Sequence, residues 1–231
     1  MSSEIKIYWS PIDMHAMNAA NQNEPRGNLI REWAGHEVMH CPSWRKYWNN
    51  VFSIDCRFNI NLLFNRDEER WVTTSDYLNH HVPTTYPYDN INIKKLIFNM
   101  QYPLYFLPDV DDLEVEIMHP FLSHNEWSNA IDVIPGNFNM GAYPRNMGYA
   151  FTIRDDLKQE YNIKEGDSLY YIRFKTNKKI KFIPFFFTEE IKALHKGAQI
   201  GRRLNSLQKF YDNYKKFRVK KLIMKEIQKQ L

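Results

Sequence analysis

The stretch from Ile131 to Phe174 most constrains the fold, because it has the pattern of short strands joined by tight bends. An apolar run that begins at Ile131 is interrupted by Pro135-Gly136, and another spans residues 149–153. Farther on, Gly166-Asp167 separates two apolar segments within residues 163–174. Because glycine supplies the positive φ that a tight turn needs, this last pattern predicts a β-hairpin. The stretch therefore favours a compact β domain over a helical bundle or a Rossmann unit.

Further strand-like runs lie on both sides of this stretch, at residues 5–9, 54–64, 71–73, 93–99, 104–107 and 113–119. Short strands at intervals of roughly ten residues are typical of a β-sandwich, a jelly roll or a barrel. Two short helices are expected at residues 29–39 and 43–50. The first of these should end before Pro42, because the residue that precedes a proline avoids the helical region.

The period of the apolar residues changes to that of a helix after residue 187. Thr188 can cap a helix whose first turn holds two glutamates, which the helix dipole favours. A stripe at spacings of three and four then follows, formed by Leu204, Leu207, Tyr211, Tyr214, Arg218 and Leu222. We expect this stripe to pack on the body or on another copy of the chain. The fold class is thus α+β, with a β-rich body at residues 1–187 and a basic helical segment at 188–231.

The composition is that of a globular protein, with 43% hydrophobic and 15% aromatic residues among 231. Cys41 and Cys56 lack the spacing of a redox or metal motif, and the first residues do not form a signal segment. No apolar run approaches the roughly 20 residues of a membrane span. These features predict a cytoplasmic protein with reduced thiols and no membrane partner.

Charge is distributed unevenly along the chain. Residues 188–231 hold 12 Lys and Arg against 4 Asp and Glu, whereas the other 187 residues hold 19 against 23. Such a basic segment can neutralise phosphates, so the candidate nucleic-acid-binding residues are Lys215, Lys216, Arg218, Lys220 and Lys221. The aromatic residues between them either stack on bases or form the buried stripe of the helix.

The pentapeptide His36-Glu37-Val38-Met39-His40 matches H-E-x-x-H, in which two histidines four apart hold Zn²⁺ and the glutamate acts as general base. Its setting argues against this function, because Gly35 and Pro42 place the motif at a helix end and no third ligand follows at a close spacing. We therefore expect no catalytic residue, cofactor or metal. The alternative is a zinc site with His36 and His40 as ligands and Glu37 as the catalytic base.

A possible ligand pocket is indicated by the loop at residues 140–145, which follows the Pro-Gly bend. The loop sets an arginine among aromatic residues, so Tyr143 and Arg145 would lie at the mouth of such a pocket, with Arg173 nearby. The alternative is a structural loop with a surface arginine. The chain has neither a G-x-S-x-G elbow nor a glycine-rich phosphate loop, so its motifs indicate neither a serine hydrolase nor a nucleotide cradle.

Over most of its length the chain resembles a group of small proteins from tailed bacteriophages of marine bacteria. The matching segments are residues 7–11, Cys41-Pro42, residues 133–138, residues 166–174 and the terminal helix rich in lysine and aromatic residues. These motifs are structural, and the resemblance implies no activity. Residues 133–174 also resemble the dUTPase-like β-clip domains. The catalytic pattern and phosphate loop of that family have no match here, so this resemblance implies only a β-clip-like architecture.

Three functions follow as hypotheses. The favoured one is a non-enzymatic bacteriophage accessory or assembly protein, which binds another protein or its own copies through the aromatic stripe. It would act in the cytoplasm of the infected bacterium or in the virion. The alternative is a nucleic-acid-binding module that uses the basic helix, and the third is a zinc-dependent hydrolase.

Overall fold

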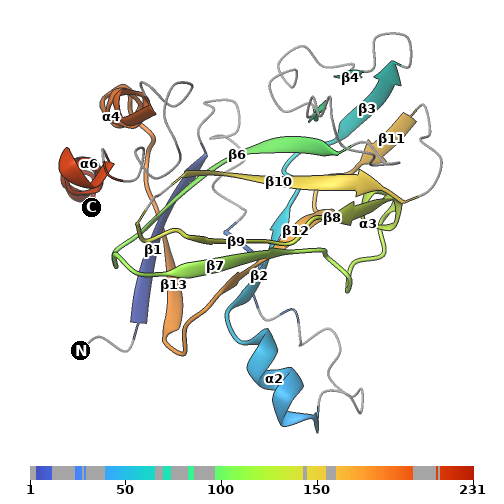
Figure 1. Cartoon of the computed structure of the whole chain (residues 1–231), viewed down its shortest axis with the longest axis horizontal. Coiled ribbons are helices and arrows are strands. Elements are labelled where there is room, and N and C mark those ends of the chain that lie inside the picture. The colour runs from blue at the N-terminus through green and yellow to red at the C-terminus, as the bar shows by residue number, and fades with distance from the viewer. Residues whose placement is uncertain are drawn as a thin grey trace.

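The computed structural model describes residues 4–11, 24–27, 29, 40–65, 70–73, 83–85, 97–142, 145–154, 160–199, 212 and 214–231. Strands dominate these residues, and a few helices accompany them, so the predicted β-rich α+β class is confirmed. The helices are α2 (Pro42–Trp48), α3 (Glu126–Ala130), α4 (Glu189–Gln199) and α6 (Val219–Gln228). Figure 1 shows the strands gathered in the middle of the molecule, with α4 and α6 at one side and α2 at the lower end.

The strands form three sheets. The largest has the order β13 (Lys179–Pro184), β1 (Glu4–Pro11), β6 (Phe98–Pro108), β10 (Arg145–Ile153) and β8 (Ile131–Val133), and β5 (Thr84–Thr85) also pairs with β6. A four-stranded sheet has the order β2 (Val51–Asp55), β12 (Ser168–Phe174), β7 (Glu114–Met118) and β9 (Gly136–Asn139). The third contains β11 (Glu160–Ile163), β3 (Ile60–Asn65) and β4 (Arg70–Thr73). The described pairings are antiparallel except that of β1 with β13.

Side chains from all three sheets meet in one main apolar core. In β3 every second residue is buried, which is the pattern of a strand with one face on the core. In contrast, β12 is buried along nearly its whole length, because both of its faces are covered. Its Tyr170 and Ile172 belong to the main core, whereas Tyr171 belongs to a separate cluster that includes Trp48 of α2.

The prediction of a β-hairpin at residues 163–174 is wrong, although the predicted turn is present. Gly166 has a φ of 88°, and the N–H of Asp167 donates to the oxygen of Lys164 at 3.0 Å. However, β11 before the turn pairs with β3, and β12 after it pairs with β2 and β7. Local turn chemistry reverses the chain, but it does not determine which edge each strand joins.

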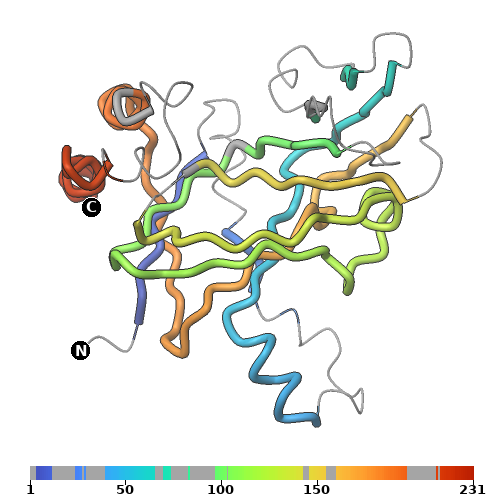
Figure 2. Tube along the Cα trace, in the orientation of Figure 1, coloured from blue at the N-terminus to red at the C-terminus, as the bar shows by residue number. Residues whose placement is uncertain are grey.

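Instead, residues 51–65, which contain β2 and β3, run antiparallel to residues 160–174, which contain β11 and β12. Both segments change sheet at the same point. The turn is bonded to Cys56, whose N–H donates to the oxygen of Asp167 at 2.7 Å and whose oxygen accepts from Gly166 at 2.8 Å. On one side of this contact β2 pairs with β12, and on the other side β3 pairs with β11. The run predicted as one strand at residues 54–64 is therefore two strands that belong to different sheets. Figure 2 traces both segments through the molecule.

Several local predictions are confirmed. β1 contains the predicted strand at residues 5–9, and α2 matches the helix predicted at 43–50. The chain also breaks near Pro135, where it leaves β8 in the largest sheet and begins β9 in the four-stranded sheet. The helix predicted at 29–39 lies outside the described residues except for Leu29.

The helices after residue 187 cover one face of the largest sheet. Tyr8, Tyr105 and Leu107 of that sheet form a cluster with Phe185 and with the apolar side chains of the helical segment, which are Ile191, Tyr214, Val219, Ile223 and Ile227. Thr188 begins α4 as expected, and its hydroxyl accepts from the N–H of Ile191 at 3.4 Å. The apolar surface of these helices is thus packed against the strands of the same chain.

The prediction of the apolar stripe along the C-terminal helix is wrong for its last turns, because other residues are buried there. Leu222 is 41% exposed, whereas Val219, Ile223 and Ile227 are buried. Arg218 has a φ of 51°, in the left-handed region, so the helix is interrupted there and α6 begins with a new rotational phase. The earlier members of the stripe, from Leu204 to Tyr211, lie outside the described residues.

Candidate functional site

An exposed aromatic surface lies around α2, and we call it the α2 face. It consists of Trp44, Tyr47, Phe121 and Arg173. Trp48 is buried beneath the α2 face. Its ring centroid lies 5.1 Å from that of Phe121 and 5.4 Å from that of Trp44. Phe121 is 43% exposed and Tyr47 is 37% exposed. The exposed rings therefore rest on a packed aromatic base.

Tyr47 is held in one orientation by two neighbours. Its hydroxyl donates to Sδ of Met118 at 3.0 Å, and the guanidinium carbon of Arg173 lies 4.3 Å from the centre of its ring. Arg173 also donates to Glu116 at 3.5 Å across the β12–β7 pairing. An arginine over a tyrosine ring is a cation–π contact, which fixes both side chains in the surface.

Two of the three residues of the predicted pocket lie among the described residues. Arg145 begins β10 in the largest sheet, whereas Arg173 lies on β12 in the four-stranded sheet and belongs to the α2 face. Tyr143 lies outside the described residues.

A cavity of about 380 Å³, lined by both polar and apolar residues, lies beside β2. It is lined by residues 24–27, by residues 53–55 of β2, by Arg57 and by Leu104 of β6. Segment 24–27 is attached to β2, because Arg26 and Ser53 exchange two backbone hydrogen bonds of 2.8 and 3.1 Å. A Cβ on Gly27 would lie 2.8 Å from Cε1 of Phe52, so a residue without a side chain lets this segment approach the strand.

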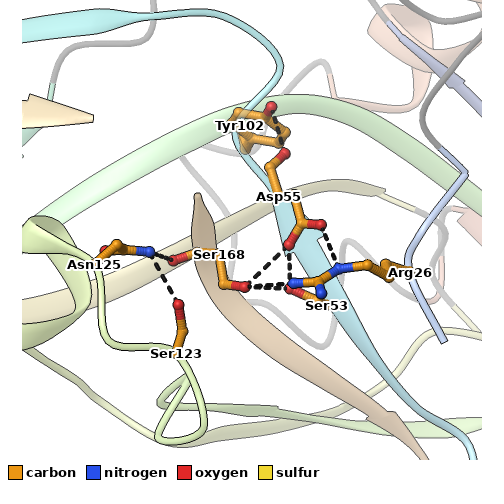
Figure 3. Close-up of polar contacts among 7 residues, drawn as sticks. All are labelled: Arg26, Ser53, Asp55, Tyr102, Ser123, Asn125 and Ser168. Atoms are coloured by element: carbon orange, nitrogen blue, oxygen red, sulfur yellow. Dashed lines mark hydrogen bonds and ion pairs between the residues drawn. The ribbon is translucent and has the colours of Figure 1, made fainter. Parts of the chain in front are cut away.

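Four side chains form a hydrogen-bonded network at the cavity, as Figure 3 shows. Arg26 donates from Nε to Oδ2 of Asp55 at 2.9 Å and from Nη2 to the hydroxyl of Ser168 at 3.2 Å. The hydroxyls of Ser53 and Ser168 both donate to Oδ1 of Asp55, Ser168 at 3.1 Å. Both oxygens of the carboxylate are thus engaged by groups of the protein.

Contacts to the backbone hold this network in place (Figure 3). The Tyr102 hydroxyl donates to the backbone oxygen of Asp55 at 2.9 Å. The side-chain amide of Asn125 donates to the backbone oxygen of Ser168 at 3.4 Å. The side-chain oxygen of Asn125 caps α3 by accepting from the N–H of Ser128 at 2.6 Å. The network is therefore connected to β6 and to α3, both of which are built into the core.

Arg57 lies in the wall of the cavity and is only 3% exposed. Its guanidinium lies over the Trp9 ring, 4.9 Å from the ring centre. Burial lowers the pKa of Arg57 from its ordinary value, while nearby Tyr102 and Asp55 act in the opposite direction. Burial likewise raises the pKa of Tyr102 well above its usual range, so this phenol stays neutral.

The groups at the cavity are suited to binding rather than to nucleophilic catalysis. A serine nucleophile needs an adjacent base, yet the carboxylate beside Ser53 and Ser168 is already paired with Arg26. Burial raises the pKa of the neighbouring Cys56 to about 12, so its thiol is protonated at neutral pH and donates to the oxygen of Phe58. The arrangement places two guanidinium groups and two hydroxyls close to the cavity.

Sequence reasoning missed this cavity because its lining comes from three separate segments, residues 24–27, residues 53–57 and Leu104. One signal was available: Asp55 and Arg57 are two charged residues inside the strand-like run at residues 54–64. Charged residues are rarely buried unless they are paired, so such positions point to a built polar site.

The candidate nucleic-acid-binding residues divide into two groups. Lys215, Lys216, Arg218 and Lys221 are exposed. Lys220 instead donates from Nζ to the oxygens of Val110 at 2.5 Å and Gly141 at 3.2 Å, and to Oδ1 of Asp111 at 2.8 Å. Because these contacts engage its ammonium group, Lys220 joins α6 to the body.

Only the last residue of the H-E-x-x-H motif lies among the described residues. His40 is exposed and precedes α2, whereas His36 and Glu37 lie outside that part of the chain. Within the described ranges, no group of three or more His, Cys, Asp or Glu residues is placed to hold a metal ion. Those ranges also contain no helix that combines the length and the apolar character needed to cross a membrane.

No protein-family model matches this chain, and no curated protein matches it either. Fold and site alone therefore define the class, which is a β-rich α+β protein with a cavity beside β2 and an exposed aromatic face.

Proposed function

We propose that this chain is a non-enzymatic accessory or assembly protein that acts by binding another protein or a second copy of itself. The α2 face is the proposed contact surface. The observation that carries the proposal is the exposure of Phe121 and Tyr47 over a packed aromatic base. Tryptophan, tyrosine and arginine are the residue types that contribute most to protein interfaces, and all three occur here.

The rigidity of this face supports the proposal. Tyr47 is held by Met118 and Arg173, so little side-chain entropy would be lost when a partner covers it. The aromatic stripe of the C-terminal helices is a weaker candidate, because its member Tyr214 is already buried against the largest sheet. We therefore place the proposed contact with a partner on the α2 face and not on the helical segment.

The source and finer architecture belong to the same proposal. The bacteriophage origin, with action in the infected cell or the virion, rests on the resemblance at residues 7–11, 133–138 and 166–174. The body is proposed to be a β-sandwich of the largest and the four-stranded sheets. This is supported by Phe106 and Ile172, which lie on different sheets and share one core.

The α2 face can be tested by site-specific photo-crosslinking. A photoreactive phenylalanine is placed at position 47 or 121, and in a matched control at position 217, where Phe217 is also exposed. We expect one discrete adduct from positions 47 and 121, either a dimer of this chain or a complex with a partner in infected cells. Phe121→Ser, introduced with the probe at position 47, should abolish the adduct. Equal adducts at position 217, or none at 47 and 121, would contradict the proposal.

A second candidate function, nucleic-acid binding, is favoured by the surface that we call the basic turn. It consists of Lys215, Lys216, Phe217, Arg218 and Lys221. Phe217 is 61% exposed, and Nζ of Lys216 lies 5.9 Å from the centre of its ring. Exposed cations beside an exposed ring can bind phosphates and stack on a base.

This second function predicts salt-dependent binding of random-sequence DNA or RNA in a fluorescence titration. The double variant Lys215→Gln, Lys216→Gln should reduce the slope of log K against log salt by about 1.4–1.8, because each lost phosphate contact contributes about 0.7–0.9. The control is Lys178→Gln with Lys179→Gln, which removes two exposed lysines, one just before β13 and one at its first position. An equal loss in both double variants would argue against the basic turn.

A further inference from the structure

We infer that the partner of the basic turn is a single-stranded nucleic acid, whose strand continues along the exposed face of α6 and stacks one base on Phe217. This inference rests on the second candidate function, nucleic-acid binding at the basic turn. To that function it adds the form of the nucleic acid and the path that the strand takes. No residue of the α2 face takes part in it.

Most of the positive charge on the basic turn and α6 is not compensated by acidic residues. Residues 214–231 hold seven Lys and Arg but a single acidic residue, Glu226. Glu226 pairs with Lys229, and Asp111 of the body pairs with Lys220. The basic residues that form no ion pair within the described ranges are Lys215, Lys216, Arg218, Lys221 and Lys225.

The acidic residues of the neighbouring helical segments leave this surface positive. Asp212 is exposed and precedes Lys215 by three residues, so counting it against the five basic residues leaves four unbalanced positive charges. Residues 200–211 contain no Asp or Glu. Glu190 of α4 interacts with the charge of Lys229, which lies at the opposite end of α6 from the basic turn. The phosphates of a nucleic acid match this excess of positive charge.

Lys221 and Lys225 extend the basic turn along α6. They are four residues apart and both exposed, so they share the solvent face of the helix, whose other face packs on the largest sheet. The acidic residues at 109–112 lie on the side of α6 that faces the body, where Lys220 contacts Asp111. Figure 1 shows α6 at the outer side of the molecule, beside α4. Like charges four apart on a helix repel each other, and bound phosphates would remove this repulsion.

The exposed ring of Phe217 favours a single strand over a duplex. The residue is 61% exposed, and Nζ of Lys216 lies 5.9 Å from the centre of the ring. The helix is interrupted at the next residue, Arg218, so the ring lies at a corner of the chain among the unpaired cations. An aromatic side chain stacks on a base whose face is free, whereas in a regular duplex both faces are covered by neighbouring base pairs.

Fluorescence anisotropy of the full chain at low salt tests the form of the nucleic acid. The probes are a labelled oligothymidylate and oligouridylate of about 16 nucleotides, and a random-sequence DNA duplex of about the same length. We expect a single strand to bind at least about fivefold tighter than the duplex, and the tighter of the two strands distinguishes DNA from RNA. Duplex binding that is equal or tighter would overturn the inference but leave the second candidate function intact. No binding of any probe would overturn both.

Vesicles that contain phosphatidylglycerol test a different anionic partner, a lipid surface. We expect them to bind more weakly than the single strands. Binding to these vesicles without binding to the oligonucleotides would overturn the inference.

The stacked base is tested with Phe217→Ala. This variant should weaken binding of the single strand at least about fivefold and change binding of the duplex less than about twofold, because only the single strand offers a free base. The matched control is Phe186→Ala, which removes a ring that is 65% exposed at the other end of α6, where Gln230 bonds to the backbone of Phe186. Unchanged binding of the single strand in Phe217→Ala, or an equal loss in Phe186→Ala, would contradict the stacking.

The path along α6 is tested with Lys225→Gln. Loss of one phosphate contact should reduce the slope of log K against log salt by about 0.7 for a single strand. The matched control is Lys229→Gln, one turn farther along the helix, where the ammonium group already bonds to both carboxylate oxygens of Glu226 at 2.7 and 2.8 Å. This control should leave the slope nearly unchanged. An equal reduction in both variants, or none in Lys225→Gln, would overturn the proposed path.

Discussion

Lys220 illustrates how a single residue can have a structural function that its neighbours in sequence do not share. Its ammonium group contacts three oxygens, two from the 110–111 region and one from Gly141, and its side chain is only 15% exposed. Lys221 is adjacent in sequence and exposed. The difference arises because successive residues of a helix point in directions about 100° apart.

We predict that Lys220→Met lowers the free energy of unfolding by about 1–3 kcal/mol, because buried carbonyl oxygens lose a charged donor. The methionine keeps the apolar stem, so the change isolates the ammonium group. Urea denaturation measures the effect, and Lys221→Met is the matched control, for which a change within about 0.5 kcal/mol is expected. Equal effects of the two substitutions would show that the contacts of Lys220 do not stabilise the fold.

Cys56 makes stability depend on pH on the alkaline side. Burial raises the pKa of its thiol from the ordinary 9.0 to about 12 in the folded chain. Above pH 9 the unfolded chain therefore loses this proton while the folded chain keeps it. The resulting stability is fully present below pH 9 and is lost progressively as the pH rises toward 12.

We predict that the free energy of unfolding falls above pH 9 with a contribution from Cys56 of at most about 1.4 kcal/mol per pH unit. Cys56→Ala should lower stability at pH 7 but make the decline between pH 9 and 11 less steep. Cys41→Ala is the control, because Cys41 is exposed and hydrogen bonds from the backbone of Trp44 and Ser43 lower its thiol pKa. A decline of unchanged steepness in Cys56→Ala would contradict this assignment.

At the scale of elements, the left-handed residue Arg218 decides which face of α6 packs on the sheet. Because the helical phase restarts after this residue, Ile223 is fully buried and Leu222 is exposed. A helix that continued without interruption from Tyr214 would have placed Leu222 on the packed side, as the spacing of three and four predicted. One backbone conformation thus reverses the positions of two adjacent apolar residues.

We predict that Ile223→Ala lowers the free energy of unfolding by about 2–4 kcal/mol, because it removes buried methyl groups and leaves a cavity. Leu222→Ala, a change of similar size on the exposed side of the same helix, should cost less than about 0.5 kcal/mol. Chemical denaturation of both variants measures the difference. A larger effect at Leu222 would mean that α6 is rotated from the orientation described.

At the scale of the whole molecule, the C-terminal helices and the body share apolar surface. The largest sheet has one face in the main core, and on its other face Tyr8, Tyr105 and Leu107 are covered by the helical segment. Within the described residues, Lys220 adds polar contacts between α6 and the body. The sheet therefore depends on the helices to exclude water from this second face.

We predict that the chain truncated after residue 187 exposes this face. Loss of the covering helices should increase binding of an apolar dye such as ANS and lower the thermal midpoint, because several large side chains return to water. Differential scanning fluorimetry and dye binding measure these changes. A truncated chain with an unchanged midpoint and no added dye binding would show that residues 1–187 fold independently of the helices.

Much of the local structure follows directly from the sequence. Glycine at position 166 specifies a turn, Pro135 interrupts a strand, and Pro42 begins a helix, because each of these residues restricts or extends the backbone angles of its own position. Alternation of apolar residues likewise indicates the strand at residues 5–9, which lies within β1. These are properties of neighbouring residues, so they can be recognised without knowledge of the fold.

Tertiary structure alone decided the strand partners, the phase of α6 and the cavity. β11 and β12 flank a tight turn, yet they join different sheets, because Cys56 bonds to that turn between β2 and β3. Arg26, Asp55 and Ser168 are far apart in sequence, and they meet only where segment 24–27 adds to the edge of β2. Pairing and site formation depend on which distant surfaces exclude water together, and no local pattern encodes that choice.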